Sequence, residues 1–374
     1  MKIFHLSDLH FGKKVNGFSM IEEQEYIILK ILQAIDSEKP DALLIAGDVY
    51  DKSIPSAEAV RLFDKFLFSL SQKQLKVFII SGNHDSAQRL SFASRLISES
   101  GIYISPAYDG NIHPFTLTDE YGKLNIYMLP FIKPADVRAA FKDIAVESYT
   151  DAVRIAIENM HINTNERNIL VCHQFVTGSV RCDSEEVSVG GIDNVDANTF
   201  DGIDYVALGH IHSPQWVGRE TVRYCGTPLK YSFSEANHKK SITIVELKEK
   251  GNVDIKLLPL EARRDFKEIS SSYEIITSKS FYESLNRQDY YRITLTDEED
   301  IYDAVTKLRV IYPNLMKLDY SNRRTAACEE INATEKKSEL EYFAELYEKQ
   351  NGCPLSDVQT QYITKIIEEV KEED

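Results

Sequence analysis

The chain contains few cysteines and no long hydrophobic run. Its five cysteines, among 374 residues, form no CxxC pair and are widely spaced, at positions 172, 182, 225, 328 and 353. This pattern argues against both a disulfide framework and a thiolate zinc site. No stretch of about 18 apolar residues occurs, and Asp8 and His10 fall where a secretory signal would need its apolar segment. We therefore expect a cytoplasmic protein without a membrane span.

Positive charge is also scarce. Lys and Arg number 43 against 59 Asp and Glu, which gives a formal net charge of -16. This argues at first against a nucleic-acid partner, because phosphate contacts are made by Lys and Arg. Half of the net charge, however, lies in residues 329–374, where 13 acids face 5 bases. An anionic substrate would have to be held by local basic groups or by metal ions.

The composition otherwise indicates a folded globular protein. Hydrophobic residues make up 43% of the chain, which includes 17 Phe and 20 Tyr. No segment is low in complexity, and no internal repeat is visible. A chain of 374 residues exceeds one ordinary hydrophobic core, so we expect two or three domains.

Short apolar segments alternate with helical patterns from residue 1 to about 250. The expected strands are KIFHLS, ALLIAG, KVFIIS, LNIYML, NILVCH and DYVALG, followed by VRYCGTP and KSITIVEL. Helical spacing occurs around 19–37, 55–72, 86–99 and 147–162. Nearly continuous apolar strands imply sheets covered on both faces. The pattern predicts an α/β fold in which helices flank a layered β sandwich.

Two smaller units are expected after this region. YYRITLT, EEDIYDAVTKLRVIYP and LMKLDY predict a strand, a helix and a strand, with Thr296 and Glu299 at capping-box spacing before the helix. SELEYFAELYEKQNG and SDVQTQYITKIIEEVKEE then predict two helices. The expected domains are 1–262, 263–322 and 323–374.

Polar residues of a few types follow five of the predicted strands. They occur in the sequences D8-L-H10, G47-D48, G82-N83-H84-D85, C172-H173 and G209-H210-I211-H212. Loops after the carboxyl ends of strands build ligand sites in layered α/β folds. Five strand ends that supply Asp, Asn and His are far more specific than any one of them.

Strand alternation suggests how two of these clusters are oriented. Residues i and i+2 of an extended strand share a face, so we expect Asp8 to point with His10, and His210 with His212. The intervening apolar residues, Leu9 and Ile211, would then point into the opposite layer. Glycines beside three of the clusters would allow the sharp turns that the site needs.

The number and type of these groups predict two metal ions. Carboxylate, amide and imidazole groups without thiolate favour Mn, Fe or Zn, and they are too many for one tetrahedral ion. Two ions roughly 3.5–4 Å apart can share a carboxylate and activate a water for attack on phosphorus. His84 is the spare imidazole, suited to donate a hydrogen bond or proton to the leaving oxygen.

The motif order D-x-H, GD, GNHD, H and GHxH resembles the calcineurin-like metallophosphoesterase superfamily. SDLHFGK, GDVYD, SGNHDS, CHQF, ALGHIH, CGTPLKYSFSE and LYEKQNGCPLS narrow the resemblance to its DNA double-strand-break repair nucleases. The resemblance implies a four-layered α/β/β/α sandwich, a small α+β capping domain and a C-terminal helix pair. It also implies an exonuclease and endonuclease that processes DNA ends and hairpins.

The same resemblance assigns roles to individual residues. It places Asp8, His10 and His212 on a first metal ion, and Asn83, His173 and His210 on a second, with Asp48 between the two. It implies manganese as the ion, His84 as the group at the leaving oxygen and Asp85 as the acid beside it. Lys52 stands where many relatives have arginine, and because lysine cannot make the bidentate phosphate contact we leave it out of the site.

The resemblance further implies partners. A homodimer would form through helices near 55–70 and 86–99, and the C-terminal helices would dock the coiled-coil base of an ATPase subunit. Apolar residues suited to such docking occur on both helices, and they are Tyr342, Phe343, Leu346, Tyr347, Tyr362, Ile363, Ile366, Ile367 and Val370.

Other interpretations remain open at this point. A phosphatase or cyclic-nucleotide phosphodiesterase would share the motifs, and a scaffold for the ATPase could keep the site as a relic. Lys52 argues against a phosphatase, and filled ligand positions argue against a relic. The remaining histidines and one cysteine are expected to be structural, and they are His5, His113, His161, His238 and Cys172.

Overall fold

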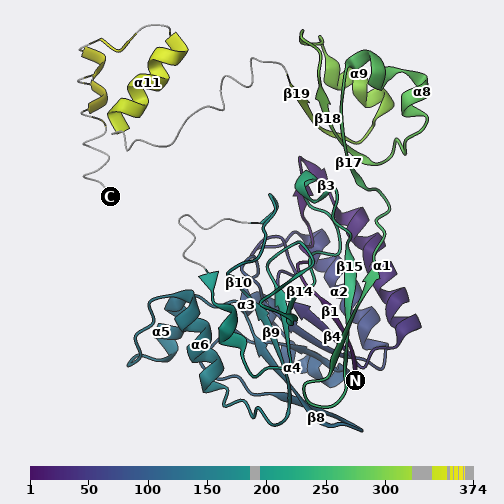
Figure 1. Ribbon diagram of the computed structural model, residues 1–374, viewed down its shortest axis with the longest axis vertical. Helices are drawn as coiled ribbons and strands as arrows, with labels where there is room; N and C mark the ends of the chain where they lie inside the picture. Colours follow the sequence, from purple (N-terminus) through teal and green to yellow (C-terminus); the bar gives the residue numbers. More distant parts are fainter. Residues whose placement is uncertain are drawn as a thin grey trace. The chain divides into compact units, whose positions relative to one another are not determined.

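The computed structural model describes residues 1–185, 194–321, 339–351, 354–356, 358–360, 362–364 and 366 (Figure 1). It separates into two compact units, Met1–Asp319 and Tyr320–Asp374. Among the described residues, none of the helices is long and apolar enough to cross a membrane. Of the expected third domain, 323–374, residues 323–338 and the end of the second helix from residue 367 lie outside the described residues.

Two six-stranded sheets form the larger unit. The first runs in the order β16-β15-β1-β4-β5-β6, with parallel pairing from β1 through β6. Its strands are β1 (Lys2–Leu6), β4 (Ala42–Ala46), β5 (Lys76–Ile80), β6 (Ile102–Ile104), β15 (Ser241–Leu247) and β16 (Val253–Pro259). The four strands predicted from KIFHLS, ALLIAG, KVFIIS and KSITIVEL are confirmed as β1, β4, β5 and β15.

The second sheet runs in the order β13-β14-β12-β9-β8-β7. Its strands are β7 (Phe115–Asp119), β8 (Gly122–Leu129), β9 (Arg167–His173), β12 (Tyr205–Gly209), β13 (Gln215–Val217) and β14 (Arg219–Tyr224). The four strands β8, β9, β12 and β14 pair in parallel, so their carboxyl ends lie at one edge.

Alternating side chains of the strands fill three separate cores. Between the sheets, Leu44 and Phe78 of the first pack with Ile169 and Ala207 of the second. The outer face of the first sheet packs against α1 (Ile21–Glu38) and α2 (Ala57–Ser71), and that of the second against α5 (Pro134–Ala140) and α6 (Tyr149–Asn159) (Figure 1). The expected α/β/β/α order is confirmed.

Two of the expected helices begin at good N-caps, but a third is broken. Ser56 accepts a hydrogen bond from the Ala59 amide at the start of α2, and Ser148 forms a capping box at the start of α6. The predicted helix over 86–99 is instead three short pieces, because Ala93 has a left-handed backbone with φ of 59°. The pieces are α3 (Ala87–Leu90), α4 (Ser94–Ile97) and η1 (Ser98–Ser100).

A three-stranded sheet follows the sandwich, in the order β17-β18-β19. Its elements are β17 (Phe266–Ser271), α7 (Tyr273–Thr277), α8 (Lys279–Tyr282), β18 (Tyr290–Leu295), α9 (Ala304–Ile311) and β19 (Leu315–Tyr320). It packs on the sandwich through Phe266 and Tyr290, and through an Arg264–Glu23 ion pair of 2.7 Å. The capping box expected at Thr296 and Glu299 is wrong, because α9 begins only at Ala304, after a turn.

The second unit contains α11 (Glu339–Asn351) and a helical segment over 358–360, 362–364 and 366. Ser356 begins that segment, since its backbone carbonyl accepts from the Thr360 amide at 2.9 Å. Gln359 donates to the Tyr347 hydroxyl at 3.0 Å, which joins the segment to α11. Smaller elements elsewhere are β2 (Lys14–Val15), β3 (Phe18–Ser19), β10 (Phe175–Val176), β11 (Asn194–Val195), η2 (Ala197–Phe200) and η3 (Phe233–Glu235).

Candidate metal centre

The predicted polar clusters come together where the carboxyl ends of the two sheets meet. Loops after β1, β4 and β5 approach loops after β9 and β12. Most of the predicted ligand side chains are buried there, and these are Asp8, His10, Asp48, His173, His210 and His212. Asn83, His84 and Asp85 are half-buried. The site therefore combines residues that lie more than 200 positions apart.

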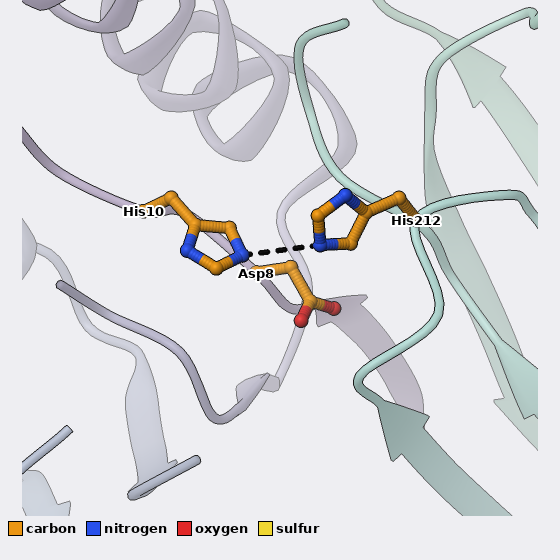
Figure 2. A group of neighbouring side chains, drawn as sticks. All are labelled: Asp8, His10 and His212. Carbon is orange, nitrogen blue, oxygen red and sulfur yellow. Dashed lines mark hydrogen bonds between the residues drawn. The ribbon is translucent and has the colours of Figure 1, made fainter. Parts of the chain in front are cut away.

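One group consists of Asp8, His10 and His212 (Figure 2). Each offers one ligand atom, and these atoms lie within 4.8 Å of one another. The Nε2 atoms of His10 and His212 face each other at 3.1 Å. Burial lowers the pKa of both imidazoles well below the usual value, so both are neutral and hold a lone pair.

A second group surrounds the side-chain oxygen of Asn83. Asn83 Oδ1 lies 3.0 Å from His173 Nε2 and 2.9 Å from His210 Nδ1. The other ring nitrogen of His173, Nδ1, lies 2.7 Å from the carbonyl oxygen of Ala46. Because a carbonyl can only accept, Nδ1 carries a proton. Burial alone would lower the pKa of His173, but Asp48 beside the ring raises it to about 9, so a cation that binds Nε2 would displace a proton from it.

Asp48 lies between the two groups. Its Oδ2 is 3.7 Å from His10 Nε2 of the first group and 3.4 Å from His173 Nε2 of the second. Burial alone would raise the pKa of Asp48, but His173 and His10 lower it well below its usual range. The carboxylate is thus anionic and within reach of both groups.

The backbone places these residues differently from the alternation that we expected. β1 ends at Leu6 and β12 at Gly209, so neither pair of ligands lies on a strand. Asp8 and His10 instead have left-handed backbones, with φ of 53° and 46°, and His210 has φ of 100°. The expected shared strand face is therefore wrong for both pairs, because the chain has already turned.

Hydrogen bonds between loops hold these turns in place. The Asp8 amide donates to the carbonyl of Gly47 at 3.0 Å, and the His10 amide to that of Asp48 at 2.9 Å. The Asp8 carboxylate accepts from the His210 amide at 3.1 Å. Leu9 and Ile211 are buried in the helix-facing cores.

Two glycines allow the loops to approach this closely. A Cβ atom at Gly82 would lie 2.1 Å from Asp48 Oδ1, and one at Gly209 would lie 1.9 Å from the carbonyl oxygen of Ala46. Both distances are far shorter than any real contact. The absence of a side chain at these positions lets the two sheets and the ligand loops meet.

His84 and Asp85 occupy different positions. His84 Nδ1 lies 3.0 Å from the Asp51 carbonyl, and its Nε2 lies 3.9 Å from Asp48 Oδ2, in a side chain that is 14% exposed. Asp85 accepts from the amides of Val49, Tyr50 and Gly82 at 2.9 to 3.0 Å, and burial raises its pKa to about 6. Asp85 thus contacts backbone, whereas His84 faces the ligand groups.

Two residues that contact this site were given no role by the sequence. Ser184 Oγ lies 2.6 Å from His212 Nδ1 and donates to Glu235 Oε1 at 2.6 Å. Burial would raise the pKa of Glu235, but the charge of Lys240 beside it lowers it to about 2. Glu235 is the last residue of the CGTPLKYSFSE motif, so the resemblance could have indicated that it belongs to the site. No motif in the sequence pointed to Ser184.

The residues expected to be structural lie away from the ligand groups. His5 is buried between the sheets, 2.8 Å from the Tyr205 hydroxyl, and burial lowers its pKa to about 3. Cys172 is a buried core residue. Within the described part of the chain, His113, His161 and His238 belong to none of the groups that could hold a metal ion. Lys52 is exposed.

The donor set is chemically suited to hard or borderline divalent cations. It offers two carboxylates, one amide oxygen and four imidazoles, with the shared carboxylate between two sets. Oxygen and imidazole donors of this kind match manganese, iron or zinc. Cys182 lies near His212 and Glu235, but burial raises the pKa of its thiol to about 12, so it is not a thiolate.

Comparisons with known proteins agree with this geometry. Residues 1–214 match the family model of the calcineurin-like phosphoesterases, and residues 262–351 match that of the type 5 capsule protein repressor C-terminal domain. The chain is 32% identical over 374 residues to the SbcD subunit of the nuclease SbcCD from Staphylococcus epidermidis, covering 98% of each chain. It is 34% identical to the protein of the same name from Staphylococcus saprophyticus, over 85% of this chain and 84% of that one.

A solved dimetal phosphatase from Danio rerio is a more distant neighbour. It is 12% identical, with a TM-score of 0.41, over 70% of this chain and 99% of that one. This likeness is too weak to add to the assignment.

Proposed function

Since the chain belongs to the calcineurin-like phosphoesterase family and resembles the SbcD nuclease over nearly its whole length, we propose that it is a metal-dependent DNA nuclease. The observation that carries the proposal is the pair of ligand groups that share Asp48. Asp8, His10 and His212 would hold one divalent ion, and the side chains around Asn83 Oδ1 the other. Two such ions would lower the pKa of a bound water, which would supply a hydroxide able to attack a phosphodiester.

The chain's own residues then divide the remaining work. His84 lies beside Asp48 and is partly exposed, so its imidazole can donate a hydrogen bond or proton to the leaving oxygen. Asp85 acts as a positioning residue, because it ties the backbone at Val49, Tyr50 and Gly82 together. We propose Mn²⁺ as the ion, which suits the mixed oxygen and imidazole donors.

A basic groove beside the site supports DNA as the substrate. It has a volume of about 380 Å³ and is lined by Lys13, Lys14, Arg292 and Lys317, next to Ser184. The first two come from the sandwich and the last two from the three-stranded sheet. Three of these cations are ion-paired, Lys13 with Asp51 at 2.9 Å and Arg292 and Lys317 with Asp319 at 2.8 and 3.4 Å, so DNA phosphates would exchange for these carboxylates. We take residues 1–262 as the nuclease domain and 263–322 as a capping domain over this groove.

Exposed apolar side chains support the proposed protein partners. Phe68 on α2 is 66% exposed, and Phe92 and Leu96 near α4 are 82% and 77% exposed, which suits a homodimer face. In the second unit, Leu346 and Tyr362 are 56% and 66% exposed. We propose that residues 323–374 dock the ATPase subunit SbcC in the cytoplasm, through these two helical segments.

Duplex DNA distinguishes the nuclease from its nearest alternative. The rival is a phosphatase or cyclic-nucleotide phosphodiesterase with the same metal centre. The purified chain with Mn²⁺ should cleave linear duplex DNA, assayed beside p-nitrophenyl phosphate, and activity on the small ester alone would refute the nuclease. His84→Gln should abolish cleavage and still bind Mn²⁺, whereas undiminished cleavage would show that another group assists the leaving oxygen.

A truncation tests the proposed partner and the scaffold alternative. Removal of residues 338–374 should abolish co-purification with SbcC, because it deletes both exposed helical faces. Cleavage of DNA by the truncated chain alone should persist, since every candidate ligand lies before residue 214. Retained co-purification would refute the docking role of these helices.

A further inference from the structure

We propose that Ser184 and Glu235 form a buried relay that fixes the proton of His212 on Nδ1 and so prepares its Nε2 to bind a divalent cation. The proposal rests on the proposed metal centre and assigns positioning residues to it. It concerns one ligand of one ion, and it follows from the hydrogen bonds behind the imidazole.

His212 has two neutral forms that differ in what they can bind. Its Nε2 faces the Nε2 of His10 at 3.1 Å. With the proton on Nε2, His212 would donate to His10, and neither nitrogen could ligate a cation. With the proton on Nδ1, the Nε2 lone pair of His212 is free to bind an ion. The environment of Nδ1 therefore decides whether His212 can contribute a ligand atom.

The group at Nδ1 is the hydroxyl of Ser184, at 2.6 Å. A hydroxyl could donate to Nδ1 or accept from it, so its direction must be set by another residue. Ser184 donates its proton to Glu235 Oε1 at 2.6 Å. With that proton engaged, Ser184 Oγ presents a lone pair to His212, and Nδ1 must be the donor.

Glu235 is fixed as an acceptor by its surroundings. The residue is 0% exposed, and its Oε2 lies 2.5 Å from the ammonium of Lys240. Its Oε1 also accepts from the Tyr231 amide at 3.1 Å. Lys240 donates in addition to the carbonyl of His212 at 2.8 Å, so the same ion pair holds the His212 backbone. A buried, fully bonded carboxylate of this kind keeps one orientation.

Ser184 is brought to His212 by a loop that is anchored independently. The Asp183 amide donates to Ser234 Oγ at 3.0 Å, and Glu185 accepts from the amides of Cys182 and His212 at 2.9 and 2.6 Å. The loop thus has contacts that do not pass through the Ser184 hydroxyl. A substitution can therefore remove the Ser184 hydroxyl while the backbone contacts of the loop remain.

His173 and His212 both have an acceptor at Nδ1, but the two acceptors differ in kind. His173 donates from Nδ1 to a backbone carbonyl, that of Ala46, which no substitution removes. His212 uses a side chain for the same purpose, so its proton position can be changed by mutation. The other ion's ligands serve as an internal reference in the same protein.

The test compares Ser184→Ala with Ser184→Thr and Ser234→Ala in the full chain. Titration of the EDTA-stripped protein with Mn²⁺, followed by calorimetry, should give two sites in the unaltered chain. Ser184→Ala should weaken one of them by about 10- to 100-fold. Ser184→Thr keeps the hydroxyl and should restore affinity. Ser234→Ala removes the loop anchor and a contact to the Ser232 hydroxyl but leaves the Ser184 hydroxyl in place, so it should match the unaltered chain.

A second measurement reports the proton directly. Nitrogen NMR of the metal-free chain, with His212 assigned through His212→Gln, should show the Nδ1–H form, and Ser184→Ala should populate the Nε2–H form. Unchanged affinity and unchanged proton position in Ser184→Ala would overturn the relay, as would an equal loss in Ser234→Ala. A failure of the unaltered chain to bind Mn²⁺ would refute the proposed metal centre, while the proton position would still decide the relay.

Discussion

The two sheets of the sandwich bring different chemistry to one site. Loops after β1, β4 and β5 supply both carboxylates, the amide and two imidazoles, and these are Asp8, Asp48, Asn83, His10 and His84. The end of β9 and the loop after β12 supply imidazoles alone, and these are His173, His210 and His212. The negative charge that attracts a cation therefore lies on the first sheet, and the second sheet adds ring nitrogens.

The two sheets also position these side chains in different ways. On the first sheet, left-handed backbones at Asp8, His10 and Asp48 and bonds between neighbouring loops orient the side chains. On the second sheet, the position of a ring proton matters as well, and it is set by acceptors behind His173 and His212. The ligand carboxylates thus lie on one sheet. Proton placement matters for the imidazoles of both sheets, and a positive φ also orients His210 of the second.

Asp48→Asn should give the largest effect and tests where the charge resides. The substitution keeps the size of the side chain and removes the anion that lies within 3.7 Å of His10 and 3.4 Å of His173. We expect both Mn²⁺ sites to be lost and DNA cleavage to fall on the order of 10³-fold. Calorimetric titration with Mn²⁺ and a duplex-DNA assay measure the two quantities.

The matched variant on the second sheet is His173→Gln. It removes one imidazole ligand from the group around Asn83 and no carboxylate, so one Mn²⁺ should still bind to Asp8, His10 and His212. Loss of both ions in His173→Gln, or retention of one in Asp48→Asn, would contradict the division of charge between the sheets.

The sequence predicted the sandwich well because its strands are almost uniformly apolar. ALLIAG and NILVCH, for instance, correspond to β4 and β9, which are buried along their whole length. The ligand residues were identified for a related reason, since polar groups directly after such strands have few other uses. Both signals are local, so they can be recognised without knowledge of the tertiary structure.

The details that failed depend on the backbone or on distant residues. Left-handed backbones at Asp8 and Ala93 overrode the strand and helix patterns, and neither is visible in residue type. Ser184 and Glu235 are 51 positions apart and meet only in the folded chain. Asp85 was identified by position, but only the structure places its carboxylate on three backbone amides.

Gly209→Ala should give the next largest effect, because it separates the sheets. Its Cβ would lie 1.9 Å from the Ala46 carbonyl oxygen of the first sheet and 2.7 Å from His173 Nδ1. We expect a loss of about 3 kcal/mol in the free energy of unfolding, at the upper end of the usual cost of overpacking. Urea unfolding in EDTA measures this loss without a contribution from bound metal.

Gly251→Ala is the control for this substitution. Gly251 has φ of 81° but nothing within 4 Å of an added Cβ. Alanine there should therefore strain the backbone without a steric clash. We expect a cost of roughly 1 kcal/mol there. Equal costs at the two positions would mean that the sheets can move apart freely at Gly209.

His5 gives the smallest expected effect and probes the layer between the sheets. Burial lowers the pKa of His5 to about 3, whereas an unfolded chain would have the ordinary value of about 6.5. Below about pH 6.5 the unfolded chain gains a proton that the folded chain cannot take up. The free energy of unfolding should therefore fall as the pH drops from 6.5 towards 3, by at most ~1.4 kcal/mol per pH unit.

His5→Leu should remove that part of the pH dependence. The substitution also leaves the Tyr205 hydroxyl without its partner at 2.8 Å, so stability should fall by roughly 1–3 kcal/mol at every pH. The informative quantity is the difference between urea unfolding at about pH 7.5 and pH 5.5 in EDTA, which should shrink by ~1.4 kcal/mol. His161→Gln, at an exposed position after α6, should leave this difference unchanged. An unaltered difference in His5→Leu would mean that water reaches His5, and that the two sheets are less closely packed there than at Gly209.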